Sequence, residues 1–567
     1  MTSRNPLTRG KKQQALVLLK AGRLDEAKLL LEKVCATDRR DAEAWCLLGA
    51  VHERVGTSDQ AETCYRHAAE LEPGRAEIHF ALGNVQHAAG LLDAAITSYR
   101  RALAIRPDFL EAQANLGAAL ESLGRLEEAL RSFEHALALD PARAETHYNL
   151  ANVQRRLGRH DVAIRAYREA LRLRPGFAAA WDNLGVALTA ATLAIVHGPQ
   201  RLELLEEAIE ARRHALRLKP DSADAHNNQA VTLRHLGRLE EAAEHYRRAL
   251  ALDLGHQDAH EGLATVALLL GRFAEGWEHY RHRISMRLPG AVLPPPVLPA
   301  DLAGRRVLVV RDQGLGDEIF FLRFAAPLKA RGAHVMYRPD PRLAAMLART
   351  GILDRLLAPD EAVEADFTCS VGDLPWLLGM RECSEAPPSL VLPPIAAPCD
   401  ALRARLARLG ARPYIGVTWR AGDKTKAHAL YKECPLSDLA RVLRQVPGTV
   451  LVLQRHPAEG EIEAFARELG RPAHDLSHLN DDFEAMLALL SLIDEYAGVS
   501  NTNMHLRAAV GETARVLVPA PPEWRWMAEG KESPWFPGFT VYRQGYDGSW
   551  EGAFDMLGAD LNHVYRR

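Results

Sequence analysis

Two different patterns of apolar residues divide the chain. Between residues 7 and 288, apolar and small side chains return every three or four positions, which is the period of amphipathic helices. After residue 304, short apolar runs such as 307–310 (VLVV) alternate with segments of helical period. Runs of this kind are typical of strands that are buried on both faces of a parallel sheet. The sequence therefore predicts a helical first half and a second half in which strands and helices alternate.

The helical half repeats with a fixed period. Its prolines at positions 73, 107, 141 and 175 are 34 residues apart, and small residues recur at the same places in each interval. Alanine and glycine at fixed helical positions let two antiparallel helices pack closely, and a recurring aromatic side chain fills the gap to the next unit. About eight units fit between residues 7 and 288, and the sixth is longer, because Pro175 and Pro220 are 45 residues apart. We expect the excess to lengthen its helices at the turn between them.

This period resembles the tetratricopeptide repeat, whose units stack into a superhelix with a concave groove. One position of successive units, on the inner face of that superhelix, holds an asparagine: Asn115, Asn149, Asn183 and Asn228. Side-chain amides there could hydrogen-bond the backbone of an extended peptide with little demand on its sequence. O-linked N-acetylglucosamine transferase, which the chain resembles here, holds protein acceptors in this way. The alternative is that asparagine is simply common at this repeat position.

Composition and charge narrow the class of protein. The 567 residues are 47% hydrophobic and 25% charged, which is typical of a globular protein with more than one core. The net charge of −3 gives no strong attraction to nucleic acid or anionic membranes. No apolar stretch reaches the roughly 18 residues of a membrane span, and the N-terminus lacks a signal-peptide layout, so we expect a cytoplasmic protein. Seven scattered cysteines without a CxxC pair favour reduced thiols over disulfides or zinc.

Proline clusters separate the predicted domains. We expect repeats in 1–288, a stiff linker in 289–303, a first Rossmann-like domain in 304–395, a second in 396–545 and a C-terminal helix in 546–567 that crosses back to the first domain. Two doubly wound parallel sheets joined by a hinge would place a ligand cleft between them, which is the GT-B architecture of many glycosyltransferases. The segments predicted as strands are 307–312, 334–339, 366–371, 414–420, 449–454, 495–500 and 514–519.

Residues 270–545 resemble the ADP-heptose:lipopolysaccharide heptosyltransferase family, in the branch fused behind tetratricopeptide repeats. The resemblance rests on five motifs in order: GRFAEGWEHYRHR from Gly271, QGLGDEIFF from Gln313, GVTWRAG from Gly416, GVSNTNMHLRAAVG from Gly498 and EWRWMAEGKESPWFPGFTVYRQ from Glu523. It implies a GT-B glycosyltransferase that inverts the configuration at the anomeric carbon. Such an enzyme needs no metal and no cofactor and uses a nucleotide-diphosphate sugar as co-substrate.

A carboxylate follows the glycine turn after the first predicted strand. Asp317 stands at the start of a helix, where a strand, a glycine turn and a helix N-terminus form a cleft. It is a candidate general base, and the resemblance places the family's catalytic aspartate on it; the alternative is a carboxylate that only stabilises the helix dipole. The loop Gln313, Gly314 and Gly316 lacks the third glycine of a dinucleotide fingerprint, so we interpret it as the acceptor side of the cleft.

The resemblance implies that the donor is bound by the second domain. Lys432 falls on the lysine that contacts the diphosphate, while the alternative for it and for Arg420 is a surface salt bridge. The sequence departs from the family at Ser500, where an aspartate is expected, and this leaves room for an inactive domain. The predicted donor-binding residues are Arg420, Gly422, Lys432, Ser500, Asn501, Thr502, His505, Trp524 and Arg525.

These features predict a glycosyltransferase that acts on a protein acceptor recruited by the repeats. The resemblance to related fusions implies a surface protein such as flagellin. The alternative is a non-catalytic repeat scaffold with a degenerate transferase domain, which Ser500 favours. A lipopolysaccharide heptosyltransferase is a third interpretation, although an asparagine ladder suits an extended peptide better. The sequence leaves the oligomeric state open, because ends of repeat arrays can associate with each other.

Overall fold

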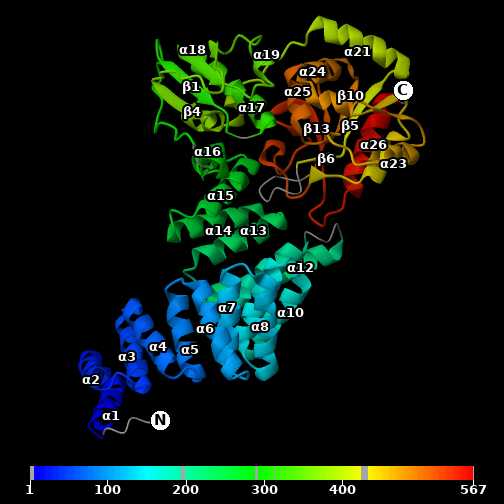
Figure 1. Cartoon of the computed structure of the whole chain (residues 1–567). Coiled ribbons are helices and arrows are strands. Elements are labelled where there is room, and N and C mark those ends of the chain that lie inside the picture. Colours follow the sequence, from blue (N-terminus) through cyan, green and yellow to red (C-terminus); the bar gives the residue numbers. More distant parts are fainter. Residues whose placement is uncertain (1–5, 193–197, 288–290, 313, 423–431, 566–567) are drawn as a thin grey trace. The chain divides into compact units, whose positions relative to one another are not determined.

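The computed structural model describes residues 6–192, 198–287, 291–312, 314–422 and 432–565 (Figure 1). Its contacts divide the chain into two compact units, one of residues 1–191 with 210–219 and one of residues 192–209 with 220–567. The first unit holds only helices, whereas the second combines helical repeats with sheets. The finer domain boundaries expected inside the second unit stay predictions.

The first unit is a row of antiparallel helix pairs, as the repeat period predicts. Its small residues are required by packing, because a Cβ atom on Gly83 would lie 2.6 Å from the Tyr99 ring and one on Gly117 would lie 2.7 Å from the Phe133 ring. The helices are α1 (Pro6–Lys20), α2 (Leu24–Thr37), α3 (Ala42–Val55), α4 (Ser58–Leu71), α5 (Ala76–Ala88), α6 (Leu92–Ile105), α7 (Leu110–Ser122), α8 (Leu126–Leu139), α9 (Ala144–Arg156), α10 (His160–Leu173), α11 (Ala178–Ala191) and the end of α12 (Pro199–Leu218).

The extra residues of the sixth unit lengthen its second helix. Helix α12 has 20 residues, whereas α10, the second helix of the preceding unit, has 14. The repeats then continue in the second unit as α13 (Ala223–His235), α14 (Leu239–Leu252), α15 (Gln257–Leu269) and the short α16 (Phe273–Tyr280).

Two histidine pairs join the helices of these last repeats. His226 and His245 face each other with 3.0 Å between their Nδ1 atoms, and His260 and His279 do so at 2.8 Å. The Nε2 atom of His226 lies 3.2 Å from the carbonyl oxygen of Pro220, which can only accept, so Nε2 carries the proton. In the neutral ring, Nδ1 of His226 must then accept from His245. Each pair needs one Nδ1 atom that donates and one that accepts. A further proton would remove the acceptor and set two N–H groups against each other.

We expect acid to destabilise these repeats. Burial, followed by the neighbouring His226, lowers the pKa of His245 to about 4, and burial with the neighbouring His260 lowers the pKa of His282 to about 4, against an ordinary 6.5. Below pH 6.5 the unfolded chain binds protons that the folded repeats refuse, so stability should be full above about pH 6.5 and fall towards pH 4. Thermal unfolding measured across this range in the protein and in a His245→Gln/His282→Gln variant tests this. An equally steep decline in the variant would assign the acid sensitivity to other groups.

The first sheet of the second unit has four parallel strands in the order β3-β2-β1-β4. They are β1 (Arg306–Val310), β2 (His334–Arg338), β3 (Arg355–Leu356) and β4 (Phe367–Ser370), with helices α17 (Leu315–Phe321), α18 (Ala325–Ala330), α19 (Ala344–Leu347) and α20 (Leu374–Leu377). The predicted strands at 307, 334 and 366 are confirmed, and the two-residue β3 was not predicted. The long helix expected after Asp317 is broken at residues 322–324, just before Pro327, whose ring removes a backbone donor and crowds the preceding turn.

The second sheet has seven strands in the order β12-β13-β11-β10-β5-β8-β9, all parallel except β12. The four predicted strands form its centre; β9 and β13 beside them were not predicted, since β13 contains a proline and a glycine. The strands are β5 (Tyr414–Thr418), β8 (Thr449–Val452), β9 (Ala473–Asp475), β10 (Glu495–Val499), β11 (Arg515–Val518), β12 (Glu532–Ser533) and β13 (Phe536–Arg543). The helices are α21 (Ala396–Leu409), α22 (Leu436–Leu443), α23 (Glu461–Leu469), α24 (Phe483–Leu492), α25 (Thr502–Ala509) and α26 (Glu551–Tyr565).

The C-terminal helix does not cross to the first sheet. Phe554, Leu557 and Leu561 of α26 are buried in a cluster with Leu439 and Val442 of α22, next to the second sheet. The expectation of a crossing helix was therefore wrong: the apolar side of α26 finds its partner on the nearer helix.

The last repeat shares one hydrophobic core with both sheets. Trp277 of α16 is 1% exposed, and its ring centroid lies 5.3 Å from that of Trp524 and 6.0 Å from that of Trp535. Just after α16, the buried Arg283 forms ion pairs with Asp312 and Asp373, which follow β1 and β4. The end of the array is therefore packed and charge-paired against the carboxyl edge of the first sheet.

Candidate functional site

The predicted acceptor loop leads into helix α17. Gly314 is the N-cap of α17, and its N–H donates to Asp317 Oδ2 at 3.2 Å. The neighbouring Glu318 is 2% exposed and accepts the N–H of Asp340 at 3.0 Å, while burial raises the pKa of the Glu318 carboxyl. The Asp317 side chain is 27% exposed, so it is the carboxylate of this turn that a substrate can reach. Gln313 lies outside the described residues.

The turn packs closely against helix α25 beside the second sheet. A Cβ atom on Gly316 would lie 2.9 Å from Cδ2 of His505, so only glycine permits this approach. His505 is 6% exposed, and its Nδ1 atom has no hydrogen-bond partner among the described residues. Burial first, and then the charges of Arg525, Arg323 and Lys432, hold the pKa of His505 well below its ordinary value, so the ring is neutral. The structure thus brings together two motifs that are far apart in sequence.

The start of α25 is capped as the sequence predicts. Asn501 is the N-cap, and its side-chain oxygen accepts the N–H groups of Asn503 at 2.9 Å and Met504 at 3.3 Å. Its amide donates to Thr418 Oγ1 at 2.8 Å, at the end of β5. Thr502 is the first helical residue. Contact of Asn501 and Thr502 with a donor stays a prediction.

Two ion pairs lie at this edge of the second sheet. Arg525 pairs with Asp317, and Lys432 pairs with Glu523. Lys432 also donates to the backbone oxygen of Ser500 at 3.1 Å, and the Ser500 hydroxyl donates to Glu523 at 3.4 Å. Ser500 therefore binds Lys432 through its backbone carbonyl. Any residue at this position could make that contact, including the aspartate that the resemblance leads us to expect.

A third cation, which the sequence did not single out, is buried nearby. Arg323 is 4% exposed and donates to the backbone oxygens of Trp535 at 2.8 Å and Phe320 at 3.0 Å. No carboxylate forms an ion pair with it among the described residues, and burial lowers the pKa of Arg323 to about 9. Sequence reasoning missed it because it lies on the apolar side of the segment that follows α17.

The side chains of Arg420 and Lys432 point to opposite faces of a short hairpin. They lie on the two strands of a small hairpin, β6 (Arg420–Ala421) and β7 (Lys432–Glu433), in which Arg420 is opposite Glu433 and Ala421 is opposite Lys432. Side chains of neighbouring residues point to opposite faces of such a hairpin. Arg420 donates two hydrogen bonds to Glu461, at 2.7 and 2.9 Å, and its contact with a donor stays a prediction. Gly422 follows with a φ of 88°, a turn conformation that favours glycine.

Trp524 has a packing role. It is 6% exposed, and its ring lies 5.3 Å from Trp277 and 5.4 Å from Phe320 between their centroids. The Arg525 guanidinium lies 4.3 Å above it. Trp524 therefore packs in the core and stacks with the Arg525 guanidinium, and its contact with a donor stays a prediction.

The repeat asparagines form hydrogen bonds between units. Asn115 donates to Asn84 at 2.8 Å, and Asn183 donates to Asn152 at 3.0 Å. Asn84 also accepts from the Tyr99 hydroxyl at 2.9 Å, and Asn152 accepts from that of Tyr167 at 2.6 Å. Sequence analysis missed Asn84 and Asn152, which recur after two periods instead of one. Asn149 and Asn228 are half-buried, like Asn115 and Asn183. Peptide binding by these amides stays a prediction.

We expect Asn84→Ala to destabilise this part of the array more than Asn115→Ala. Loss of Asn84 leaves two donors unpaired, the Tyr99 hydroxyl and the half-buried Asn115 amide, at about 1–3 kcal/mol, whereas loss of Asn115 removes one hydrogen bond, at about 1 kcal/mol. Hydrogen exchange of residues 76–122, measured by mass spectrometry, ranks the two variants. Equal protection in both would show that the shared acceptor adds nothing.

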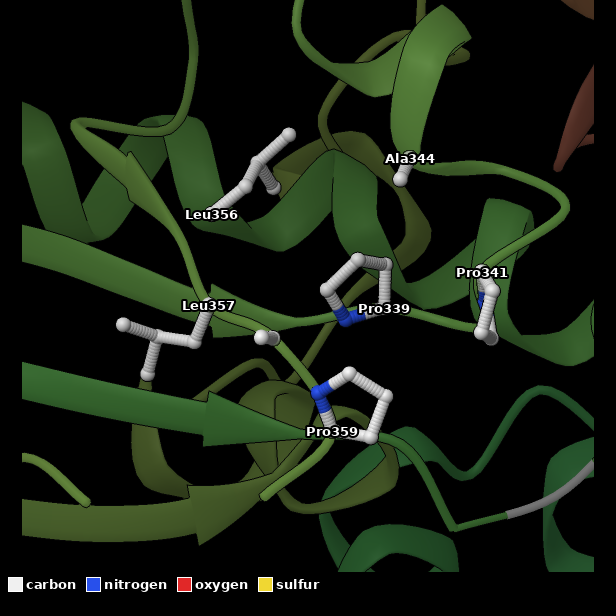
Figure 2. Close-up of a pocket in the computed structure, with 7 residues that line it drawn as sticks. Pro339, Pro341, Ala344, Leu356, Leu357 and Pro359 are labelled. Atoms are coloured by element: carbon white, nitrogen blue, oxygen red, sulfur yellow. The ribbon is translucent and has the colours of Figure 1, made fainter. Parts of the chain in front are cut away.

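A separate apolar pocket of about 300 Å³ lies at the carboxyl ends of β2 and β3 (Figure 2). Figure 2 shows three proline rings around it, Pro339, Pro341 and Pro359, with Leu356 and Leu357 beside them. No lining side chain carries a polar group, so the pocket offers shape without chemistry of its own.

The described part of the chain holds no cluster of three or more metal-ligating side chains. None of its helices combines the length and the apolar character that crossing a bilayer requires.

Models of the tetratricopeptide repeat match residues 42–75, 87–124, 108–176 and 223–255. The N-terminal part of the chain is thus a tetratricopeptide-repeat array, a class of structure that binds protein partners. The protein FlbA of Caulobacter vibrioides is 28% identical in an alignment 286 residues long, and the match covers 46% of this chain and 47% of that protein. The chain thus spans about half the length of this curated relative.

Two solved structures each match about a third of this chain. One is the MamA protein, 23% identical over 32% of this chain and 92% of that one, with a TM-score of 0.28. The other is YrrB, described as a tetratricopeptide-repeat protein with an unusual peptide-binding site. It is 22% identical over 35% of this chain and 96% of that one, with a TM-score of 0.30.

Proposed function

We propose that the protein is a glycosyltransferase, which moves a sugar from a nucleotide-diphosphate sugar to a hydroxyl group of a protein acceptor held by the repeats. Two α/β sheets whose helices α17 and α25 meet agree with a GT-B arrangement. The resemblance of residues 270–545 to the heptosyltransferase family supports the same class.

One observation carries the proposal: a reachable carboxylate beside the first sheet contacts a buried arginine beside the second, and two further cations act on the neighbouring His505. Asp317 contacts Arg525, while the neutral His505 feels the charges of Arg525, Arg323 and Lys432. Sugar transfer needs this combination, because a hydroxyl must lose its proton while a diphosphate leaves with negative charge.

The roles follow from these positions. Asp317 would take the proton of the acceptor hydroxyl as its oxygen attacks the anomeric carbon. Lys432 and Arg525 would stabilise the charge of the departing diphosphate, and the buried, neutral His505 would keep its unpartnered Nδ1 for a polar group of the donor. The repeat groove would deliver an extended acceptor through its asparagine amides.

A mass-spectrometric screen of nucleotide sugars with the full-length protein tests the proposal. Donor consumption by the protein, lost in an Asp317→Ala variant, would support it, and equal rates in both proteins would contradict the assignment of the base. A chain that binds no donor at all would favour the alternative below.

The second candidate function is a repeat scaffold with an inert transferase domain. Ser500 in place of the family's aspartate favours this function. The ion pair of Lys432 with Glu523 favours it too, because it neutralises the lysine that would bind the donor's diphosphate. This function predicts capture of protein partners by the repeats with no binding of nucleotide sugars.

A further inference from the structure

Arg525 has more hydrogen-bonding capacity than the folded chain uses. Its guanidinium donates to Asp317 through Nη2 and lies 4.3 Å above the Trp524 ring and 4.8 Å above the Phe320 ring. The residue is 7% exposed, and its buried Nε atom has no hydrogen-bond partner among the residues that the structure describes. A buried N–H group without an acceptor is costly, so this donor indicates an acceptor that arrives with a ligand.

Asp317 is occupied in this arrangement. Its Oδ2 atom accepts the N–H of Gly314 at 3.2 Å, and its Oδ1 atom accepts from Arg525. An acceptor hydroxyl that is to give its proton to Asp317 would have to displace one of these two donors. As the structure stands, the candidate base is therefore restrained by the cation beside it.

A diphosphate is a stronger partner for Arg525 than Asp317 is. It offers more charge and more acceptor oxygens, and a guanidinium can meet two of them with its parallel donors. Arg525, Arg323 and Lys432 all act on His505, and two of them pair with the carboxylates Asp317 and Glu523, whereas Arg323 has no carboxylate partner among the described residues. The site therefore already favours an additional anion.

We propose that Arg525 exchanges partners: it restrains Asp317 before the donor binds and releases it when the diphosphate of the donor takes its place on the guanidinium. This inference rests on the proposed function, because the base and the donor are those of sugar transfer. Released Asp317 then takes the proton of the acceptor hydroxyl, the hydroxyl oxygen bonds to the anomeric carbon, and the bond from that carbon to the diphosphate breaks. The diphosphate keeps the electron pair. Donor binding before acceptor activation follows as the order of the reaction.

Calorimetric titration with inorganic pyrophosphate tests this exchange without turnover. The full-length protein, Asp317→Asn, Arg525→Gln and the double variant Asp317→Asn/Arg525→Gln are compared. Since Arg525 no longer has to leave a carboxylate, Asp317→Asn should bind pyrophosphate about five- to tenfold more tightly than the unaltered protein. In the Arg525→Gln background, the same change should alter the affinity less than twofold. Arg525→Met, which removes the charge but keeps an unbranched side chain over the Trp524 ring, replaces Arg525→Gln if the latter fails to fold.

Each outcome separates the exchange from general electrostatics. An equal gain from Asp317→Asn in both backgrounds would overturn the exchange, since removal of any nearby negative charge would then explain it. Equal affinity in all four proteins would also overturn it, yet would leave the transferase function open to the donor screen. Absence of pyrophosphate binding in every variant would count against both proposals.

Discussion

Asp317→Asn is expected to lower the turnover number of sugar transfer by about 10²–10⁴-fold, the usual contribution of a general base. The amide keeps the shape of the carboxylate and its place in the turn of α17, but it cannot take a proton. Since Asp317 is 27% exposed at a helix start, the substitution should leave the fold intact. The base is thereby tested separately from the framework around it.

Initial rates with a donor identified by the nucleotide-sugar screen measure this effect, with donor affinity determined in parallel. The matched control is Asp438→Asn, because Asp438 is also an aspartate in a first helical turn but forms its ion pair with the exposed Arg441 of its own helix. The control should keep its rate within about twofold. Comparable rates for Asp317→Asn and the control would remove Asp317 from the chemistry and return it to a helix-capping role.

Trp277→Ala should destabilise the second unit by about 3–5 kcal/mol, the range for a large aromatic removed from a core. Trp277 is 1% exposed and contacts Phe321 of the first sheet's helix α17 as well as Trp524 and Trp535 beside the second sheet. The cavity left behind would lie where the last repeat and both sheets share one core. The loss should therefore reach all three elements together.

Denaturant unfolding followed by circular dichroism, with hydrogen exchange of residues 273–280 and 315–324, measures this loss. The control is Trp181→Ala in the first unit, where the half-buried ring stacks on His214 with 4.5 Å between centroids. That change should cost about 1–2 kcal/mol and leave exchange in 315–324 unaltered. If Trp277→Ala loosened only the repeats, the last repeat and the sheets would fold independently.

The sequence by itself determined the repeat array and the central strands. The 34-residue period sets which small residues meet which aromatic rings within one unit, as Gly83 and Tyr99 do, and such contacts depend on neighbours close in the chain. The apolar runs at 307–310 and 495–499 are buried on both faces, so their composition alone identifies them. The glycine turn before Asp317 and the Asn501 cap were readable for the same local reason.

Only the tertiary structure decided which of the charged residues stand together. Asp317 and Arg525 are 208 residues apart in sequence, and nothing local to either residue predicts their ion pair. The register of one short hairpin separates Arg420 from Lys432, although both look alike in sequence. Trp524 became a packing residue because the last repeat supplies Trp277 to cover it. Ion pairs and aromatic contacts form only between side chains that lie within a few ångströms of each other. Packing between segments far apart in the sequence decides which side chains come that close, and no local sequence pattern does.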